Sequence, residues 1–178
     1  MIKINTAETE KYVPILRCGD EVLLSGTVYT ARDAAHKKIK ELIEKGEPLP
    51  FGLEGAAVYY AGPTPAKNGL AVGSCGPTTS SRMDPYAPLF IEKGLAFMIG
   101  KGERSEKVKE AMKKYGAVYF CAIGGAGALA SKCIAKCDVI AFPELGCESV
   151  KKMEFVDFPL IVGVDTYGNS IFDIREKS

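Results

Sequence analysis

The sequence lacks several features that would assign the protein to a broad class at once. It has almost no net charge, because 23 Lys and Arg residues are balanced by 22 Asp and Glu residues. Such a chain has no overall positive field that draws it to nucleic acid or to an anionic membrane. No apolar run approaches the ~20 residues of a membrane span, and the polar start MIKINTAETEKY is unlike a secretory signal. We therefore expect a cytoplasmic protein that binds neither nucleic acid nor membrane.

Metal-binding signatures are also missing. The six cysteines are scattered, without a CxxC pair and without a zinc or iron–sulfur pattern, so we predict no metal site on this chain. Only Cys133 and Cys137 are close, four residues apart on a predicted helix. We interpret them as two small side chains on a buried helix face. The single histidine, His36, fits a surface or structural role better than a catalytic one.

The chain does contain the pattern of one globular domain. With 178 residues, 47% of them hydrophobic, it can bury a substantial core, and we expect a single domain over residues 1–178. We find no internal repeat, low-complexity tract or clear linker. Predicted strands alternate with predicted helices, which indicates an α/β fold. Strands crowded near the end of the sequence favour a mixed sheet or a barrel-like closure flanked by helices.

The expected elements follow from apolar periodicity and from the turn residues that bound each run. Strands are predicted at 21–31, 55–63, 70–77, 95–102, 117–124, 139–143, 151–159, 160–165 and 169–174. A hairpin turn is expected at 166–169. Helices are predicted at 32–46, 84–94, 105–116 and 124–137.

Residues at the helix ends predict where helices begin and end. Thr30 and Asp33 have the spacing of a capping box for the first helix, and Gly46 stands where its C-terminal stop belongs. Pro85 is expected in the first turn of the second helix. Ser105 is the predicted N-cap of the third helix.

Cationic residues lie where predicted strands end. Ligands of α/β folds gather at such ends, because the loops are free to vary and helix N-termini expose unpaired N–H groups. Arg32 starts a helix, where a cation opposes the helix dipole, and Lys101 lies between two glycines. Arg82 follows the hydroxyl run 78–81. Since Arg binds carboxylates bidentately, these groups predict a pocket for a small anion with more than one carboxylate; a phosphate pocket would use similar parts.

The glycine run GGAGA at 124–128 supports an alternative. It follows a predicted strand and precedes a helix, as a dinucleotide-binding turn does, but Ala130 stands where the third glycine of GxGxxG would be. We interpret the run as close helix–strand packing, or as an anion site at the helix N-terminus, rather than as an NAD site. A nucleotide-binding enzyme stays open as an alternative.

Five stretches in a fixed order resemble a known family: GTVYTARDAAHKKI, VYYAGPTPA, GPTTSSRMD, IGKG and DFPLIVGVDTYGNS. They are similar to the β subunit, or C-terminal domain, of the class I iron–sulfur hydro-lyases, which include fumarate hydratase and L(+)-tartrate dehydratase. The resemblance covers nearly the whole chain. It implies a swivelling β/β/α domain that works with a separate α subunit holding a [4Fe–4S] cluster, in an α2β2 assembly.

The resemblance also implies a reaction and a set of site residues. The family adds water reversibly to the double bond of a dicarboxylate. Arg32, Arg82 and Lys101 would bind the carboxylates, and Thr78 would be the hydroxyl that handles the proton on carbon. The residues that would shape the same loop are Ser80, Ser81 and Asp84. No specific role passes to His36.

Among the family's reactions, we expect the hydration of fumarate to (S)-malate. Two alternatives remain: the β subunit of an L(+)-tartrate dehydratase, which converts tartrate to oxaloacetate and water, and a non-catalytic anion-binding module of the same fold.

Overall fold

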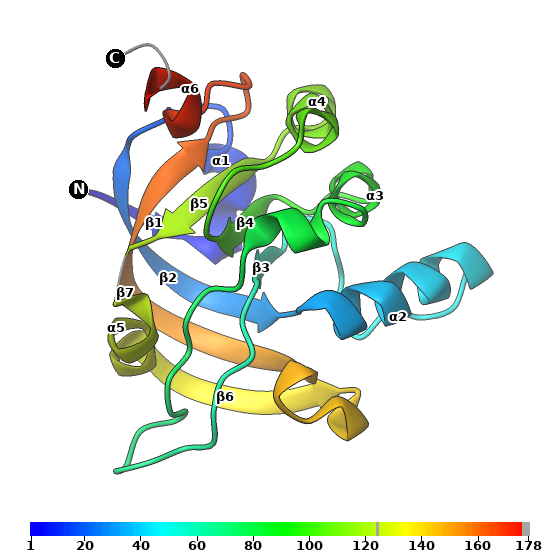
Figure 1. Ribbon diagram of the computed structural model, residues 1–178, viewed down its shortest axis with the longest axis vertical. Helices are drawn as coiled ribbons and strands as arrows, with labels where there is room; N and C mark the ends of the chain where they lie inside the picture. Colours follow the sequence, from blue (N-terminus) through cyan, green and yellow to red (C-terminus); the bar gives the residue numbers. More distant parts are fainter. Residues whose placement is uncertain (124, 176–178) are drawn as a thin grey trace.

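The computed structural model describes residues 1–123 and 125–175. The strands within these residues are β1 (Ile2–Asn5), β2 (Glu21–Thr30), β3 (Ala57–Tyr59), β4 (Phe97–Gly100), β5 (Val118–Ala122), β6 (Ile134–Ala141) and β7 (Val150–Val164). They form one sheet in the order β1-β2-β3-β4-β5-β7-β6, and β2 also pairs with β7. This pairing closes β2, β3, β4, β5 and β7 into a barrel, with β1 and β6 added to it (Figure 1). The expected barrel-like mixed sheet is confirmed.

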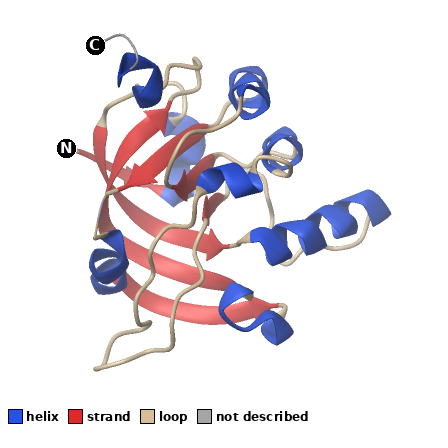
Figure 2. Ribbon diagram, viewed as in Figure 1, coloured by secondary structure: helices blue, strands red, loops and turns tan. Residues whose placement is uncertain are grey.

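Helices cover the barrel. The α-helices of the described residues are α1 (Thr9–Tyr12), α2 (Asp33–Lys45), α3 (Ala87–Glu92), α4 (Glu106–Tyr115), α5 (Ala126–Cys133) and α6 (Ile171–Arg175). The 3-10 segments of the same residues are η1 (Thr6–Glu8), η2 (Ser80–Met83) and η3 (Pro143–Glu148). Helices α2, α3 and α4 lie on one side of the sheet (Figure 2). No helix in the described part of the chain is long and apolar enough to cross a membrane.

Alternating side chains of the central strands build two cores. In β3, Tyr59 packs into the barrel interior, whereas Val58 and the following Tyr60 pack against the helices. In β4, Phe97 points inward and contacts Phe120 of β5 edge to face, with 4.9 Å between the ring centroids. Each such side chain stabilises the fold by about 1.5–3 kcal/mol through burial. The barrel is therefore filled by side chains, and polar groups are left for its ends.

The strand directions determine where loops meet. Strands β2, β3, β4 and β5 pair in parallel, while β7 runs antiparallel to both β2 and β5. The carboxyl ends of β2, β3 and β4 therefore lie at one edge of the barrel. The segments that leave this edge are the start of α2, the long loop after β3, and the turn that follows β4.

The predicted strand at 70–77 is wrong. These residues lie in a long loop between β3 and η2, which extends away from the barrel at the bottom of Figure 1. Thr64 and Ser74 bond across the loop itself, with 2.9 Å between Thr64 N and Ser74 O. Val72 and Cys75 are nevertheless buried against the barrel core. The apolar residues at 70–77 therefore indicate burial and not a strand, because an extended loop that is buried selects the same apolar side chains as a buried strand.

The end of the chain also differs from its prediction. The runs 151–159 and 160–165 form one strand, β7, and residues 169–174 contain helix α6 instead of a strand. A turn does occur near the predicted position, over residues 165–168, where Gly168 N donates to Asp165 O at 3.1 Å, but no second strand follows within the described residues to make the predicted hairpin. Ser170 makes a single bridge to Val164, and its hydroxyl then accepts from Phe172 N at 3.2 Å, which starts the helix.

The predicted capping box of α2 is wrong. Arg32 is the N-cap residue and makes no side-chain cap bond. The Thr30 hydroxyl instead accepts from Lys151 N of β7, at 3.1 Å. A tertiary hydrogen bond thus takes the group that the sequence assigned to the helix end. Gly46 does end α2 in the left-handed conformation, with φ of 67°, and Ser105 does cap α4.

Two further local predictions are corrected. Pro85 precedes α3, and Pro88 occupies its first turn instead. Cys133 is the last residue of α5, whereas Cys137 lies in β6, so the two do not share a helix face. Gly124, the first residue of the run 124–128, lies outside the described residues.

Gly100, at the end of β4, has no room for a side chain. A Cβ there would overlap Ser80 Oγ and lie 2.8 Å from Tyr60 Cδ2. We expect Gly100→Ala to lower the free energy of unfolding by about 1–3 kcal/mol, the usual cost of overpacking. Urea unfolding measures it. At Gly52, where a Cβ would meet nothing within 4 Å, the same substitution should not destabilise the protein; equal losses in both variants would contradict the packing argument.

Candidate active site

The polar segment 78–84 is inserted between the ends of β3 and β4. Thr78 N donates to Tyr60 O at 2.6 Å, and Ser80 N donates to Lys101 O at 2.9 Å. Thr79 and Lys101 pair in parallel as an isolated bridge. The segment therefore continues the sheet at its edge, and it places the backbone of Thr78 beside the end of β3 and that of Ser80 beside Lys101.

An ion pair joins this segment to the start of α2. Arg82 Nη2 lies 2.6 Å from Asp33 Oδ2, although the two atoms are not aligned for a hydrogen bond. Asp33 follows Arg32 directly in the chain. The segments that carry Arg32, Thr78, Arg82 and Lys101 thus meet at one edge of the barrel.

The side chain of Arg32 is mostly buried and incompletely bonded. It lies across Gly62, where a Cβ would come within 3.2 Å of Arg32 Nη1. Its Nε is 3.9 Å from Glu148 Oε1, and neither atom has a hydrogen-bond partner among the described residues. Buried polar groups are nearly always hydrogen-bonded. Arg32 therefore has donor capacity that no acceptor among the described residues uses.

A buried lysine holds the segment that carries Glu148. Lys151 is 7% exposed, and its ammonium donates to Cys147 O at 3.0 Å, Ser149 O at 3.1 Å and Ser149 Oγ at 2.8 Å. Burial lowers the pKa of Lys151. These bonds fix the end of η3 against β7, and they set the position of the carboxylate that faces Arg32.

The hydroxyl of Thr78 and the ammonium of Lys101 have no side-chain partner in the ranges 1–123 and 125–175. Thr78 is half-buried and Lys101 is exposed. In the described part of the protein, the Thr78 hydroxyl makes no hydrogen bond and the Lys101 ammonium makes no ion pair. Both groups are available to a ligand at the barrel edge.

The three residues predicted to shape the loop have different surroundings. Tyr119 OH donates to Gly102 O at 2.8 Å, so the buried Ser80 hydroxyl donates to Tyr119 OH, also at 2.8 Å. Asp84 accepts two bonds from the turn before α4. Ser81 is exposed, and its carbonyl accepts from Asp84 N at 3.2 Å. Ser80 and Asp84 therefore bond towards the protein interior.

His36 is fully buried. Of the surface and structural roles predicted for it, only the structural role fits this position. Its Nδ1 lies 2.9 Å from Arg32 O, and because a carbonyl only accepts, the ring donates this bond. The ring stacks on Phe90, with 5.0 Å between centroids. Its Nε2 has no partner among the described residues. Burial lowers the pKa of His36 from 6.5 to about 4, so the ring is neutral at pH 7.

Sequence reasoning missed the groups that hold the cations. From the sequence, Asp33 is predicted only as part of a helix cap and not as the ion-pair partner of Arg82. Glu148 lies more than one hundred residues from Arg32 in the chain, so the sequence does not predict their contact. Arg104 is completely buried beside Asp84. Nothing in a charged turn such as GERS indicates burial, so the sequence offers no local signal for it. Only tertiary structure brings these partners together.

The arrangement can bind a small polyanion. Two guanidinium groups, one ammonium and one hydroxyl are carried by segments that meet at this barrel edge, and each cation can make charge-assisted hydrogen bonds to carboxylate oxygens. No group of three or more His, Cys, Asp or Glu side chains converges in the ranges 1–123 and 125–175. The described residues therefore do not fit an iron–sulfur cluster, which needs several convergent thiolates.

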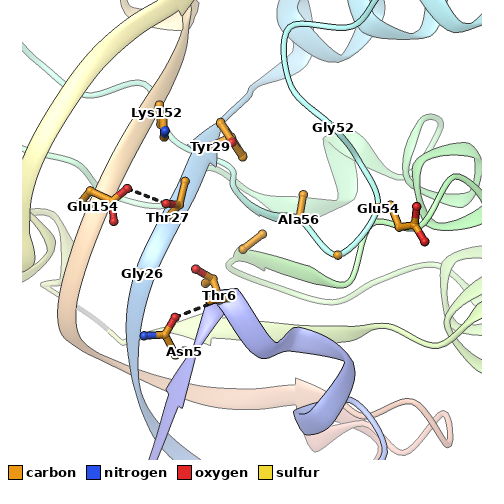
Figure 3. A pocket seen from close by; sticks show the side chains of 13 residues that line it. Asn5, Thr6, Gly26, Thr27, Tyr29, Gly52, Glu54, Ala56, Lys152 and Glu154 are labelled. Carbon is orange, nitrogen blue, oxygen red and sulfur yellow. Dashed lines mark hydrogen bonds between the residues drawn. The ribbon is translucent and has the colours of Figure 1, made fainter.

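A polar depression of about 460 Å³ lies elsewhere on the barrel. Figure 3 shows side chains of β1, β2 and β7 around it, including Asn5, Tyr29 and Lys152. Thr27 Oγ1 donates to Glu154 Oε1 there at 2.6 Å. None of the predicted site residues lines this depression, so it is separate from the candidate site.

Known proteins resemble the chain over most of its length. The family described as Fumarase C-terminus matches residues 1–174. Fumarate hydratase 2 of Leishmania major is 46% identical over 156 residues, 86% of this chain and 28% of that protein. Fumarate hydratase class I, aerobic, of Escherichia coli is 44% identical over 151 residues, 84% of this chain and 28% of that protein. The chain thus spans little more than a quarter of these relatives.

Another relative is close to this chain in size. The Putative L(+)-tartrate dehydratase subunit beta of Methanocaldococcus jannaschii is 40% identical over 175 residues, which are 95% of this chain and 90% of that protein.

The buried His36 predicts a specific pH dependence. The folded protein has a His36 pKa of about 4, below the 6.5 of the unfolded chain, so acid favours unfolding between these values. We expect His36 to lower the free energy of unfolding by about 3 kcal/mol as pH falls from 7 to 4. His36→Asn should lack this component. NMR titration of the ring, the only histidine in the chain, checks the cause, and a midpoint near 6.5 would contradict it.

Proposed function

The chain belongs to the Fumarase C-terminus family, and from this we propose that it is the β subunit of a heteromeric hydro-lyase that converts fumarate to (S)-malate reversibly. The observation that carries the proposal is the convergence of Arg32, Thr78, Arg82 and Lys101 at one barrel edge. The names of the Leishmania major and Escherichia coli relatives support the reaction. The Methanocaldococcus jannaschii relative supports a separate subunit, because it is named a subunit and has nearly the same length.

The cations bind the two carboxylates of the substrate. Arg82 keeps one side of its guanidinium on Asp33, 2.6 Å away, and offers its remaining N–H groups to one carboxylate. Arg32 has an unpartnered Nε, and Lys101 has an exposed ammonium. A planar guanidinium matches two carboxylate oxygens at once, so the arginines also orient the substrate.

The same cations stabilise the transition state. Removing a proton from the carbon beside a carboxylate spreads negative charge onto that carboxylate. Fixed guanidinium and ammonium groups stabilise this charge more than they stabilise the bound substrate, which accelerates the reaction. Their fixed positions matter, because groups that are already oriented need no reorganisation as the charge develops.

Thr78 handles the proton on carbon. Its hydroxyl is free at the barrel edge, with its backbone held by the 2.6 Å bond from Thr78 N to Tyr60 O. A threonine hydroxyl is a poor base unless a neighbouring group accepts its proton. No carboxylate among the described residues bonds to it, so we assign this acceptor to a carboxylate of the partner subunit.

The partner completes the chemistry. Elimination of water also needs a Lewis acid for a poor leaving group, and the described residues of this chain offer no ligand set for one. We assign a [4Fe–4S] cluster to the α subunit, in an α2β2 assembly. In the longer relatives, 72% of the sequence lies outside the matched 28%. We propose that this additional sequence corresponds to the α subunit.

An L(+)-tartrate dehydratase is the second candidate. The relative from Methanocaldococcus jannaschii carries that name, and this chain covers 90% of it. Fumarate and tartrate share both carboxylates and differ in hydroxylation, so the cations described above serve either substrate. Anaerobic co-expression with a cluster-bearing α subunit, followed by assays of fumarate, malate and both tartrate enantiomers, separates the candidates. An assembled complex without hydro-lyase activity would refute both.

Thr78→Ala tests the proton-transfer role. In the assembled enzyme we expect kcat to fall by about 10²–10⁴, with the subunits still assembling because the Thr78 backbone bond remains. Thr78→Ser keeps the hydroxyl and is the matched control; its kcat should stay within about tenfold of the natural enzyme. Near-normal turnover by the alanine variant would remove Thr78 from this role.

Arg82→Lys tests the carboxylate grip. Losing a charge-assisted bond of about 1.5–3 kcal/mol should raise KM for the dicarboxylate by roughly 10-fold or more, since lysine lacks the planar fork. Steady-state kinetics of the assembled enzyme measures it. Arg17→Lys is the control, because Arg17 lies against the Tyr167 ring, away from the candidate site. An unchanged KM in Arg82→Lys would count against the assignment.

A further inference from the structure

Arg104 carries a charged side chain that is completely withdrawn from solvent, at 0% exposure. It lies in the turn between β4 and α4. Its Nε donates to Asp84 Oδ1 at 2.8 Å, and its Nη2 donates to Tyr60 OH at 3.1 Å. Its guanidinium carbon is 4.8 Å from the centre of the Tyr119 ring. Every face of this group is occupied by the protein, so it is not available to a ligand.

Of the three hydrogen-bond partners of Arg104, which are Asp84, Met98 and Tyr60, Tyr60 and Asp84 contact the two ends of the polar segment. Tyr60 lies beside the start of the segment, because its carbonyl accepts from Thr78 N at 2.6 Å. Asp84 ends it, directly after η2, and its second oxygen accepts from Ser105 N at 2.8 Å. One guanidinium therefore connects the residue beside Thr78 to the residue two positions after Arg82.

Tyr119 extends these contacts to the middle of the segment. Its ring faces the Arg104 guanidinium, and its hydroxyl accepts from Ser80 Oγ and donates to Gly102 O, both at 2.8 Å. Gly102 follows Lys101 directly. The buried contacts around Arg104 thus reach residues next to both proposed substrate-binding cations: Ser80 and Asp84 flank Arg82, and Gly102 follows Lys101.

Stability alone does not account for a buried charge here. Removing a guanidinium from water is costly, and a buried ion pair is often no more stabilising than apolar side chains of the same volume. A charge-assisted, forked set of bonds does fix relative positions, because each bond requires its own direction. Arg104 also stays charged: burial lowers its pKa, but the nearby Tyr60, Asp84 and Tyr119 together hold that pKa above the usual range.

We propose that Arg104 is a positioning residue of the candidate site: its contacts with Tyr60, Asp84 and Tyr119 hold the segment 78–83 and the Lys101 turn in fixed relative positions. The inference rests on the proposed function only for what the positioned residues do. The positioning itself is a property of this chain and can be measured without turnover.

Amide hydrogen exchange of the purified chain tests it. In Arg104→Lys, which keeps the charge and loses the fork, we expect the Thr78 and Ser80 amides to exchange at least tenfold faster. Amides inside the barrel, such as those of Phe97 and Phe120, should change less than threefold. Arg17→Lys, the same substitution at an exposed position, should change neither set. Unchanged exchange in the segment, or equal acceleration of segment and barrel, would overturn the proposal.

Tyr119→Phe provides a second variant that removes a single oxygen from the same contacts. It should accelerate exchange of the Ser80 amide at least threefold, since the hydroxyl that joins Ser80 to Gly102 is lost, and leave the Thr78 amide within twofold. No change at Ser80 would overturn the proposal, even if Arg104→Lys failed to fold.

Kinetics of the assembled enzyme adds a readout that loss of folded protein does not affect. Arg104→Lys should raise KM for the dicarboxylate at least fivefold, because Arg82 is displaced, whereas a smaller folded fraction lowers only the apparent kcat. An unchanged KM would overturn the positioning role. A complex that lacks hydro-lyase activity altogether would refute the proposed function, and the exchange experiment would still decide the role of Arg104.

Discussion

The parallel pairing of β2, β3 and β4 is the constraint on which the candidate site depends. Parallel strands end at the same edge, and β7 closes the barrel by pairing with β2 and β5, which fixes that edge in place. The start of α2, the polar segment and the turn after β4 consequently meet although they are far apart in sequence. A Gly at position 100 permits the close approach, because Ser80 occupies the space that a side chain would need.

The candidate site carries cations whose hydrogen-bonding capacity is not satisfied by the described residues. Arg82 and Arg32 face carboxylates of their own chain, Asp33 and Glu148, while two buried atoms of the Arg32 and Glu148 pair remain without hydrogen bonds. The guanidinium groups are therefore held in place by carboxylates of the same chain, while Arg32 Nε still lacks a hydrogen-bond acceptor among the described residues. Beneath it, the Arg104 contacts support the same loops from the interior. Binding groups at the surface and fixed supports below them are what a preorganised anion site requires.

Local signals predicted the parts that local physics determines. Ser105 marks the start of α4 because its hydroxyl caps the helix, and Lys101 was placed at the barrel edge from the end of its strand. The strand predicted around Val72 was wrong, since burial in a loop and burial in a strand select the same residues. The prediction that Cys137 lies on a helix was wrong, because no glycine or proline marks the change from helix to strand. Arg104 had no signal at all, because its partners come from three separate loops and strands.

The most direct test of the central claim is a crystal structure of this chain assembled with its cluster-bearing partner and (S)-malate. Both carboxylates should contact cations of this chain, drawn from Arg32, Arg82 and Lys101. The Thr78 hydroxyl should also lie within hydrogen-bond reach of the partner's carboxylate and face the reacting carbon. Malate bound elsewhere, with these four side chains away from it, would contradict the account.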